Sequence, residues 1–236
     1  MKMIIYVVGY PKSGNTWLAR LLGDVLDCPI RAGGNKLALA DGGYSRQGKY
    51  IIRQGHITEC PKDGKVVWIK RDPRDVSVAA RHYWKIDTLA ETIKIVGEGL
   101  WPIQHGGGWE KFNDFWNASE YHVSTTYEAL SRDTEKELTR IIHGLFGLFG
   151  GVGYDAILDA IERESFENRK SLIEKHGDDM PYGKNIQLIN MRKGIVGDWK
   201  NHYTQIHKAL AEKYFGDAMR MYGYDAPEGW CDLDKE

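Results

Sequence analysis

Residues 3–26 read MIIYVVGYPKSGNTWLARLLGDVL, and this stretch decides the fold. Its first part, Met3 to Val8, is a β-branched and aromatic run bounded by turn residues, which predicts a buried strand. From Thr16 to Leu26 the apolar residues recur at helical spacing, so we expect a helix there. The chain therefore begins with a strand, a glycine-containing loop and a helix.

The loop between this strand and this helix predicts an anion site. Its spacing, Gly-x4-Gly-x-Thr, is that of a phosphate-binding P-loop with one change, because Asn15 stands where nucleotide kinases have lysine. A lysine occurs earlier in the loop, at Lys12, so the loop keeps its cation. We expect the backbone N–H groups of Ser13 to Thr16 to cradle an anion at the start of the helix. A turn of this composition without a ligand is the alternative.

Strand-like and helix-like segments alternate along the rest of the chain. This alternation predicts an α/β fold with a central parallel β-sheet flanked by helices. No repeat, low-complexity tract or proline-rich linker divides residues 1–236, so we expect a single domain. The further strands are expected at Tyr50 to Arg53, Val66 to Lys70 and Tyr121 to Thr126, and the helices at Asp75 to Trp84, Asp133 to Leu145, Tyr154 to Arg163 and Thr204 to Met221.

Composition argues against several function classes. The 236 residues include 32 Lys and Arg against 33 Asp and Glu, so no basic excess points to nucleic acid as a partner. The cysteines, Cys28, Cys60 and Cys231, have neither CxxC nor Cys/His spacing and support no disulfide framework or zinc site. No apolar run reaches the roughly 20 residues of a membrane span, and Met3 to Val8 is too short for a signal sequence. We therefore expect a cytoplasmic setting without a membrane anchor.

The loop sequence YPKSGNTW resembles a motif of one enzyme family. It is similar to the 5′-phosphosulfate-binding loop of the sulfotransferases that use 3′-phosphoadenosine 5′-phosphosulfate (PAPS), whose usual form is YPKSGTTW. Asn15 replaces the first threonine and keeps a polar side chain at the loop apex. The resemblance implies a P-loop NTPase-like sulfotransferase fold and cofactor contacts from Lys12, Ser13, Gly14, Asn15, Thr16 and Trp17.

A second stretch, VVWIKRDPRDV at residues 66–76, resembles the 3′-phosphate motif of this family. The family's arginine is Arg71 here, but the serine that follows it eight residues later is replaced by Ala79. Ser77 lies two residues before Ala79, and two residues along a helix rotate a side chain by about 200°. We therefore do not expect Ser77 to substitute. For Arg74 and Asp75 we expect a solvent-exposed helix start without a ligand role.

The stretch MRKGIVGDWKN at residues 191–201 resembles the C-terminal cofactor motif of the family over its full length. The resemblance implies that Arg192, Lys193 and Gly194 bind a phosphate, since two cations beside an unhindered backbone suit a dianion. For residues 197–199 we expect a structural role in seating the segment. By the same resemblance, Trp17 and Phe166 flank the adenine and Tyr127 touches the base.

His56 occupies the place of the family's catalytic histidine, between the strand-like runs at residues 50–53 and 66–70. Imidazole titrates near neutral pH and can take the proton of an attacking hydroxyl or amine. The resemblance implies His56 as general base and Lys12 as the cation that stabilises the departing phosphate. Gln54 stands where many eukaryotic relatives have a second lysine.

The implied reaction is in-line transfer of a sulfuryl group from PAPS to a small acceptor, with adenosine 3′,5′-bisphosphate as product and no metal. One alternative is a P-loop small-molecule kinase that uses ATP and Mg²⁺, against which Asn15 argues. The other is a non-catalytic module that binds adenosine 3′,5′-bisphosphate, to which Gln54 and Ala79 give weight.

By elimination, residues 22–49 and 85–120 should build the acceptor pocket, the latter with Trp101, His105, Trp109 and Trp116. No motif indicates the acceptor or an oligomeric state.

Overall fold

The computed structural model describes residues 2–32, 36–37, 48–100, 107–120, 122–147, 151–176, 191, 193–224 and 230–231. At its centre lies a sheet with the strand order β3-β2-β4-β1-β5-β6. The short β3 is antiparallel to β2, and the other strands run parallel. The strands are β1 (Met3–Val8), β2 (Ile30–Ala32), β3 (Lys36–Leu37), β4 (Tyr50–Gly55), β5 (Gly64–Lys70) and β6 (His122–Thr126).

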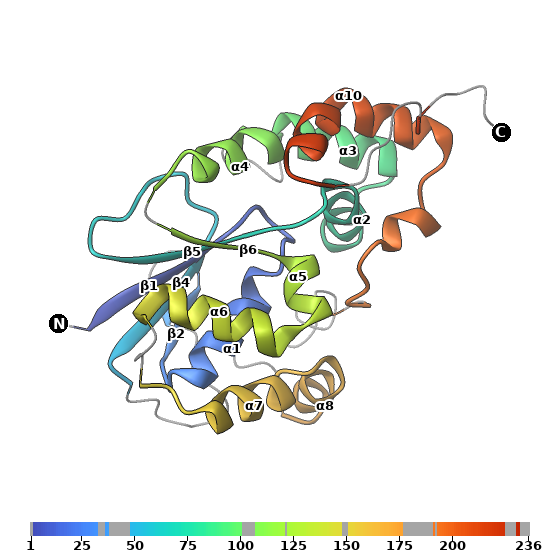
Figure 1. Cartoon of the computed structure of the whole chain (residues 1–236). Helices are drawn as coiled ribbons and strands as arrows, with labels where there is room; N and C mark the ends of the chain where they lie inside the picture. The colour runs from blue at the N-terminus through green and yellow to red at the C-terminus, as the bar shows by residue number, and fades with distance from the viewer. Residues whose placement is uncertain are drawn as a thin grey trace.

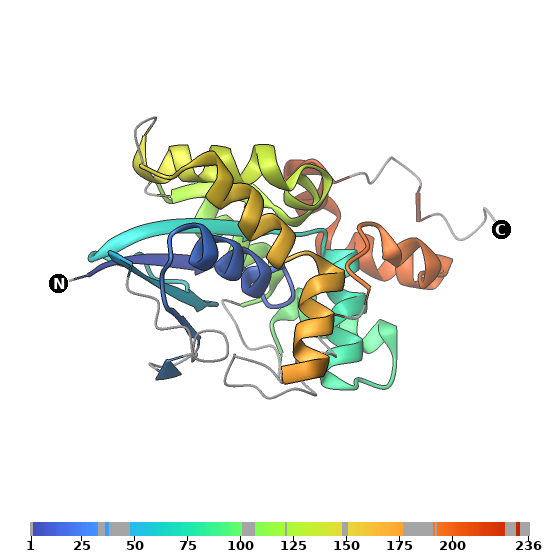
Figure 2. The ribbon, with the colours of Figure 1, turned by 90° about the horizontal axis from the view of Figure 1, so that it is seen from below.

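Helices cover both faces of this sheet (Figure 1). One face carries α1 (Asn15–Val25), α5 (Tyr127–Arg132), α6 (Thr134–Phe146) and α7 (Tyr154–Arg163). The opposite face carries α2 (Pro73–Trp84), α3 (Leu89–Glu98), α4 (Trp109–Asn117) and α10 (Gln205–Met221). Figure 2 views the first layer, in which α7 packs on α1 and leads into α8 (Phe166–His176). The predicted α/β architecture with a central parallel sheet is confirmed.

The core consists of two hydrophobic clusters, one on each face of the sheet. Side chains of β1 alternate between them, with Ile5 and Val7 in the first cluster and Val8 in the second. A central parallel strand is buried on both faces, which explains the uninterrupted apolar run at the start of the chain. None of the described helices has the length and apolar character needed to cross a bilayer.

The expectation that Trp109 and Trp116 help to build an acceptor pocket is wrong. Both side chains are fully buried in the second cluster. Trp109 Nε1 donates to the carbonyl of Arg71 at 3.0 Å, and Trp116 Nε1 donates to that of Ile57 at 2.9 Å. These indoles therefore anchor α4 to the segments that follow β5 and β4. Residues 101–106 lie outside the described part of the chain.

The carboxyl ends of the parallel strands meet at one edge of the sheet, toward the segment that precedes α10 in Figure 1. Gly9 follows β1, His56 follows β4, Arg71 follows β5 and Tyr127 follows β6. Open α/β sheets bind their ligands at this edge. The topology thus gathers residues that are far apart in the sequence.

Candidate active site

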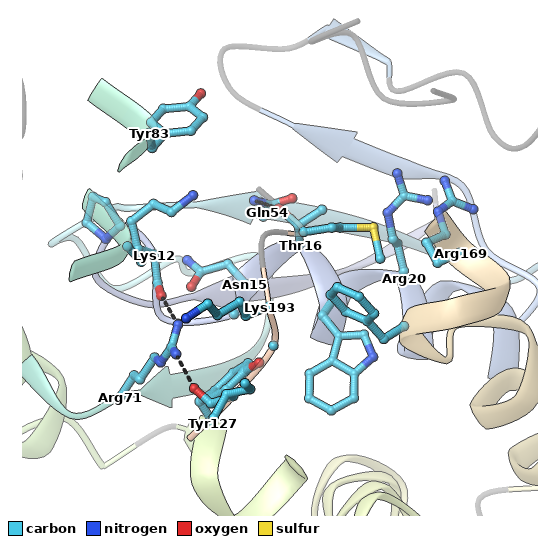
Figure 3. A pocket seen from close by; sticks show the side chains of 18 of the residues that line it. Lys12, Asn15, Thr16, Arg20, Gln54, Arg71, Tyr83, Tyr127, Arg169 and Lys193 are labelled. Carbon is cyan, nitrogen blue, oxygen red and sulfur yellow. Dashed lines mark hydrogen bonds between the residues drawn. The ribbon is translucent and has the colours of Figure 1, made fainter. Parts of the chain in front are cut away.

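A cavity of about 330 Å³ opens at this edge of the sheet. This volume falls in the range of small-molecule sites. No described residue that lines the cavity is acidic. A ligand with several negative charges therefore suits the cavity best. Five of its lining side chains are cationic, namely Lys12, Arg20, Arg71, Arg169 and Lys193 (Figure 3).

The loop before α1 has the backbone shape of an anion cradle. Gly14 has a φ of 97°, and a Cβ built there would lie 2.6 Å from the Tyr127 ring, so glycine is required. Ser13 N–H donates to the carbonyl of Tyr10 at 3.1 Å and takes part in the turn. The cradle expected at residues 13–16 therefore begins after Ser13. It consists of the first-turn N–H groups of α1, which have no carbonyl to bind within the helix.

Asn15 ties this loop to the ends of two strands. Its Nδ2 donates to the carbonyl oxygens of Gly9 at 2.9 Å and Gly55 at 3.2 Å. The amide that replaces the kinase lysine thus organises the loop. Gln54 donates from Nε2 to Thr16 Oγ1 at 2.9 Å, which joins β4 to α1 in a similar way.

His56 is held in one tautomer by the same strand end. Its Nδ1 lies 2.7 Å from the carbonyl oxygen of Gly9. Asn15 Nδ2 also lies 3.2 Å from this Nδ1, but it donates to the carbonyl oxygens of Gly9 and Gly55. The Gly9 carbonyl oxygen only accepts and is the nearer group, so we assign the proton to Nδ1 and the lone pair of the neutral ring to Nε2. The imidazole also lines the cavity. This arrangement suits a base that receives a proton on Nε2.

Lys12 is constrained at its backbone and at its ammonium group. Its φ of 69° is uncommon for a residue with a side chain. Its Nζ lies 4.2 Å from the centroid of the Tyr83 ring, at cation–π distance. Burial, and then the nearby charge of Arg71, lower the pKa of Lys12 to about 7. An anion in the cavity would raise this pKa again.

Arg71 connects the phosphate loop to the C-terminal segment. Its guanidinium donates to the carbonyl of Lys12 and to that of Ile195, each at 3.3 Å (Figure 3). The same group lies 4.1 Å from the centroid of the Tyr127 ring and 3.7 Å from Asp75. One side chain thus contacts three segments of the site.

The expectation of a solvent-exposed helix start at Arg74 and Asp75 is wrong, because each is only 2% exposed. Asp75 accepts the N–H groups of Gly197 at 2.7 Å and Trp199 at 2.9 Å. Arg74 pairs with Asp72 at 2.7 Å and packs 4.0 Å from the centroid of the Trp199 ring. Docking of residues 197–199 excludes water from the first turn of α2.

The C-terminal segment is also held by its own carboxylate, that of Asp198 in the 3₁₀ helix η2 (Asp198–Asn201). Asp198 is 2% exposed and accepts from Lys193 at 3.1 Å and from Asn201 at 3.1 Å. Gly194 has a φ of 67° and passes close to the Phe166 ring. Lys193 and Gly194 line the cavity, whereas Arg192 lies outside the described residues.

The three aromatic residues expected to contact the base, Trp17, Tyr127 and Phe166, all line the cavity. Trp17 and Tyr127 pack edge to face with ring centroids 5.7 Å apart. Trp17 Nε1 donates to the carbonyl of Glu164 at 3.2 Å, which fixes the indole beside the turn that leads into α8. Phe166 is the first residue of α8 and is half-buried. The flat faces expected from the sequence are therefore brought to one cavity.

Three residues that were not predicted as site residues also line the cavity. They are Arg20, Arg169 and Tyr83. Ser77 is buried and donates to the carbonyl of Pro73 at 2.8 Å, so it does not replace the missing hydroxyl at Ala79. Within the described residues, no group of three or more His, Cys, Asp or Glu side chains is arranged to hold a metal ion.

With this geometry established, comparison with known proteins assigns the family. Residues 58–223, well over half of the chain, match the family model described as Sulfotransferase domain. The chain belongs to the sulfotransferase family. Sulfotransferase 2A6 of Mus musculus is 24% identical over 254 residues, covering 91% of this sulfotransferase and 84% of the relative. Cytosolic sulfotransferase 12 of Arabidopsis thaliana is 26% identical over 261 residues, covering 92% and 79% respectively.

Solved structures share the fold of this sulfotransferase. Mouse sulfotransferase SULT7A1 complexed with PAP has a TM-score of 0.71 at 23% identity, covering 98% of this chain and 88% of that one. Retinol dehydratase in a complex with retinol and PAP has a TM-score of 0.67 at 16% identity, covering 96% and 84% respectively. The resemblance stated from the sequence is confirmed at the level of family and fold.

Proposed function

We propose that this sulfotransferase transfers a sulfuryl group from PAPS to a hydroxyl or amine of a small acceptor and releases adenosine 3′,5′-bisphosphate, abbreviated PAP. One observation carries the proposal. His56, held with Nδ1 protonated, lines the same cation-rich cavity as the P-loop lysine, Lys12. A base and a cation in one cavity are the groups that transfer to a neutral acceptor requires.

The described residues fit the charge of PAPS. Arg71 lines the cavity, and its buried Nε has no hydrogen-bond partner among the described residues. A ligand phosphate at this end could accept a hydrogen bond from this Nε. We assign the 5′-phosphate to the loop at residues 12–17, and the 3′-phosphate to Arg71, Lys193 and Gly194 together with Arg192. When bound, PAPS supplies the electrophilic sulfur and an anionic leaving group.

His56 acts as the general base in this proposal. The Gly9 carbonyl holds the Nδ1 proton, so Nε2 accepts the proton of the acceptor hydroxyl or amine as that group attacks. The resulting imidazolium is stabilised by the same carbonyl. The carbonyl of Gly9 also binds Asn15, so one strand end orients both the base and the loop.

Lys12 acts on the opposite side of the reaction. Its ammonium and the helix N-terminus at residues 15–17 stabilise negative charge that develops on the departing phosphate. For loose transition states of this kind, positioning and electrostatics supply most of the catalysis. No step requires a metal.

Two experiments test this proposal against its alternatives. The fold alone does not determine the reaction, since one structural neighbour is named a retinol dehydratase. The first experiment is a thermal-shift titration with PAP, AMP and ATP plus Mg²⁺. A ligand at 100 times its Kd adds about 2.7 kcal/mol of stability, enough to raise the Tm by several degrees. We expect the largest shift with PAP, whereas a shift with ATP and Mg²⁺ alone would indicate a kinase.

The second experiment is transfer from ³⁵S-labelled PAPS to a panel of small phenols, alcohols and amines. Sulfated product supports the enzyme. Tight PAP binding with no product from any acceptor class favours a non-catalytic PAP-binding module. A small-molecule acceptor and a cytoplasmic setting remain part of the proposal, and the transfer assay identifies the acceptor class.

A further inference from the structure

Two buried arginines lie at the end of the cavity opposite the proposed phosphate sites. Arg20 on α1 is 4% exposed and Arg169 on α8 is 7% exposed, yet both line the cavity. Figure 3 shows their guanidinium groups on the side away from Lys12 and Arg71. The charges of the two phosphates therefore do not account for this pair.

Each of these arginines follows an aromatic residue by one helical turn. Arg20 comes three residues after Trp17 on α1, and Arg169 comes three residues after Phe166 on α8. Residues three apart on a helix share a face, so each guanidinium belongs to the same surface as the ring before it. The two helices thus present two pairs of the same kind, a flat ring and a cation, to one cavity.

The charge at this end is positive. Glu164 Oε1 lies 3.4 Å from Arg169 Nη1, and the Glu164 side chain is buried and does not line the cavity. Glu164 therefore holds Arg169 in place. The groups that Arg20 and Arg169 present to the cavity are donors only, because a guanidinium has five N–H donors and no acceptor. A ligand part that fits here combines a flat face with acceptor atoms on its edge.

The purine ring of PAP meets this description, since it stacks on aromatic faces and its ring nitrogens accept hydrogen bonds. We propose that Arg20 and Arg169 recognise the base of the cofactor by donating hydrogen bonds to the nitrogens of the six-membered purine ring. This inference rests on the proposed function above. Glu164 is a positioning residue for Arg169.

The competing interpretation is that the arginines only connect α1 to α8. A chemical comparison separates the two. Benzimidazole riboside 3′,5′-bisphosphate keeps both phosphates and a flat double ring for stacking, but it lacks the nitrogens of the six-membered ring. If the two arginines have only a structural role, substituting either of them changes the affinity for this analogue and for PAP by the same factor. If they recognise the base, the substitution weakens the binding of PAP alone.

The experiment measures Kd for both ligands by isothermal titration calorimetry with wild type, Arg20→Met and Arg169→Met. Arg163→Met is the matched control, because Arg163 is an exposed neighbour on α7 that pairs with Asp24 and does not line the cavity. We expect wild type to bind PAP at least tenfold more tightly than the analogue, as charged hydrogen bonds of this kind contribute such factors. In Arg20→Met and Arg169→Met this preference should fall to within about threefold, and Arg163→Met should keep it.

Equal weakening of both ligands, or an unchanged preference in both variants, overturns the inference. Arg169→Lys provides a second variant if a methionine variant does not fold, because lysine keeps the charge but not the planar donor geometry. We expect Arg169→Lys to lose most of the preference. A wild-type protein that does not bind PAP at all refutes the proposed function instead.

Discussion

The two segments assigned to the phosphates are held in different ways. The loop at residues 9–17 is fixed by backbone geometry and by the strand ends beside it, and Tyr10 and Ser13 within it are fully buried. The segment at residues 193–199 is held by two carboxylates, Asp75 and Asp198, while its residues 195 and 196 are 50% and 43% exposed. The loop is therefore an integral part of the sheet edge, whereas the C-terminal segment packs onto the start of α2 through side-chain contacts. We therefore expect changes near the loop to affect chemistry and changes at the docking contacts to affect affinity.

The largest expected effect tests the loop side of this comparison. His56→Ala should lower kcat by about two orders of magnitude or more, the usual scale for a general base, with the Kd for PAP nearly unchanged. Initial-rate kinetics with PAPS and calorimetry with PAP measure the two quantities. His143→Ala on the exposed side of α6 is the control. Normal turnover in His56→Ala would contradict the assignment.

The pH dependence of binding tests Lys12, also on the loop side. The pKa of Lys12 is lowered to about 7, and an anionic ligand raises it. Above pH 7 the empty protein has lost this proton and must take it up on binding, so the affinity falls as pH rises. We expect the Kd for PAP to increase about fivefold from pH 7 to 8 and about ninefold from pH 8 to 9, because about half of the Lys12 side chains are already deprotonated at pH 7.

Two variants sharpen this prediction. Lys12→Arg keeps the charge at all of these pH values, and Lys12→Ala removes it, so both should flatten the dependence. Calorimetry in buffers of different ionisation enthalpy measures the proton uptake directly. A slope that persists in Lys12→Ala belongs to another group and contradicts the prediction.

A smaller effect is expected at the docking contacts. Asp75→Ala leaves two N–H groups, that of the part-buried Gly197 and that of the buried Trp199, without their acceptor. We expect the free energy of unfolding to fall by about 2 kcal/mol and the Kd for PAP to rise about tenfold. Asp75→Asn, which keeps an acceptor oxygen, should lose less. The kcat at saturating PAPS should change little in either variant, and a loss as large as that of His56→Ala would erase the distinction between the regions.

The smallest expected effect concerns Tyr83, whose ring faces the Lys12 ammonium. Tyr83→Leu removes a cation–π contact of about 1 kcal/mol and should lower kcat about threefold. It should also change the pH at which affinity begins to fall, because the ring stabilises the charged form of Lys12. Tyr83→Phe keeps the ring and is the matched control. An equal loss of kcat in both variants would mean that the hydroxyl, and not the ring, matters, and wild-type kcat in both would mean that neither does.

The elements that the sequence predicted well are those with local signals. The strand at residues 3–8 was predicted with its observed bounds, and Asp133 and Thr204, predicted as helix starts, are the N-cap residues of α6 and α10. Helix α3 was missed, although Thr88 and Glu91 form a start signal of the Ser/Thr-x-x-Glu type. Its surroundings of glycine and charged residues obscured the pattern.

The site residues that were misjudged depend on distant partners. Asp75 and Arg74 have the composition of an exposed helix start, and they are buried by residues more than a hundred positions later, Gly197 and Trp199 on Asp75 and Trp199 and Trp230 on Arg74. Trp109 and Trp116 have the composition of a ligand pocket and pack into the core instead. For Arg20 and Arg169 a signal was present, the spacing of three from an aromatic residue. This spacing indicates a shared binding surface only when the structure shows that α1 and α8 line the same cavity.

The position of Arg71 implies thermodynamic coupling between the two regions compared above. The same guanidinium binds the carbonyls of Lys12 and Ile195, so a displacement of one carbonyl changes the contact with the other. If a ligand phosphate alters this arrangement, docking of residues 193–199 and occupancy of the loop influence each other by the same factor. Free energies for the two phosphates of one ligand are then not additive, and a nucleotide that lacks one phosphate loses more than the contacts of that phosphate.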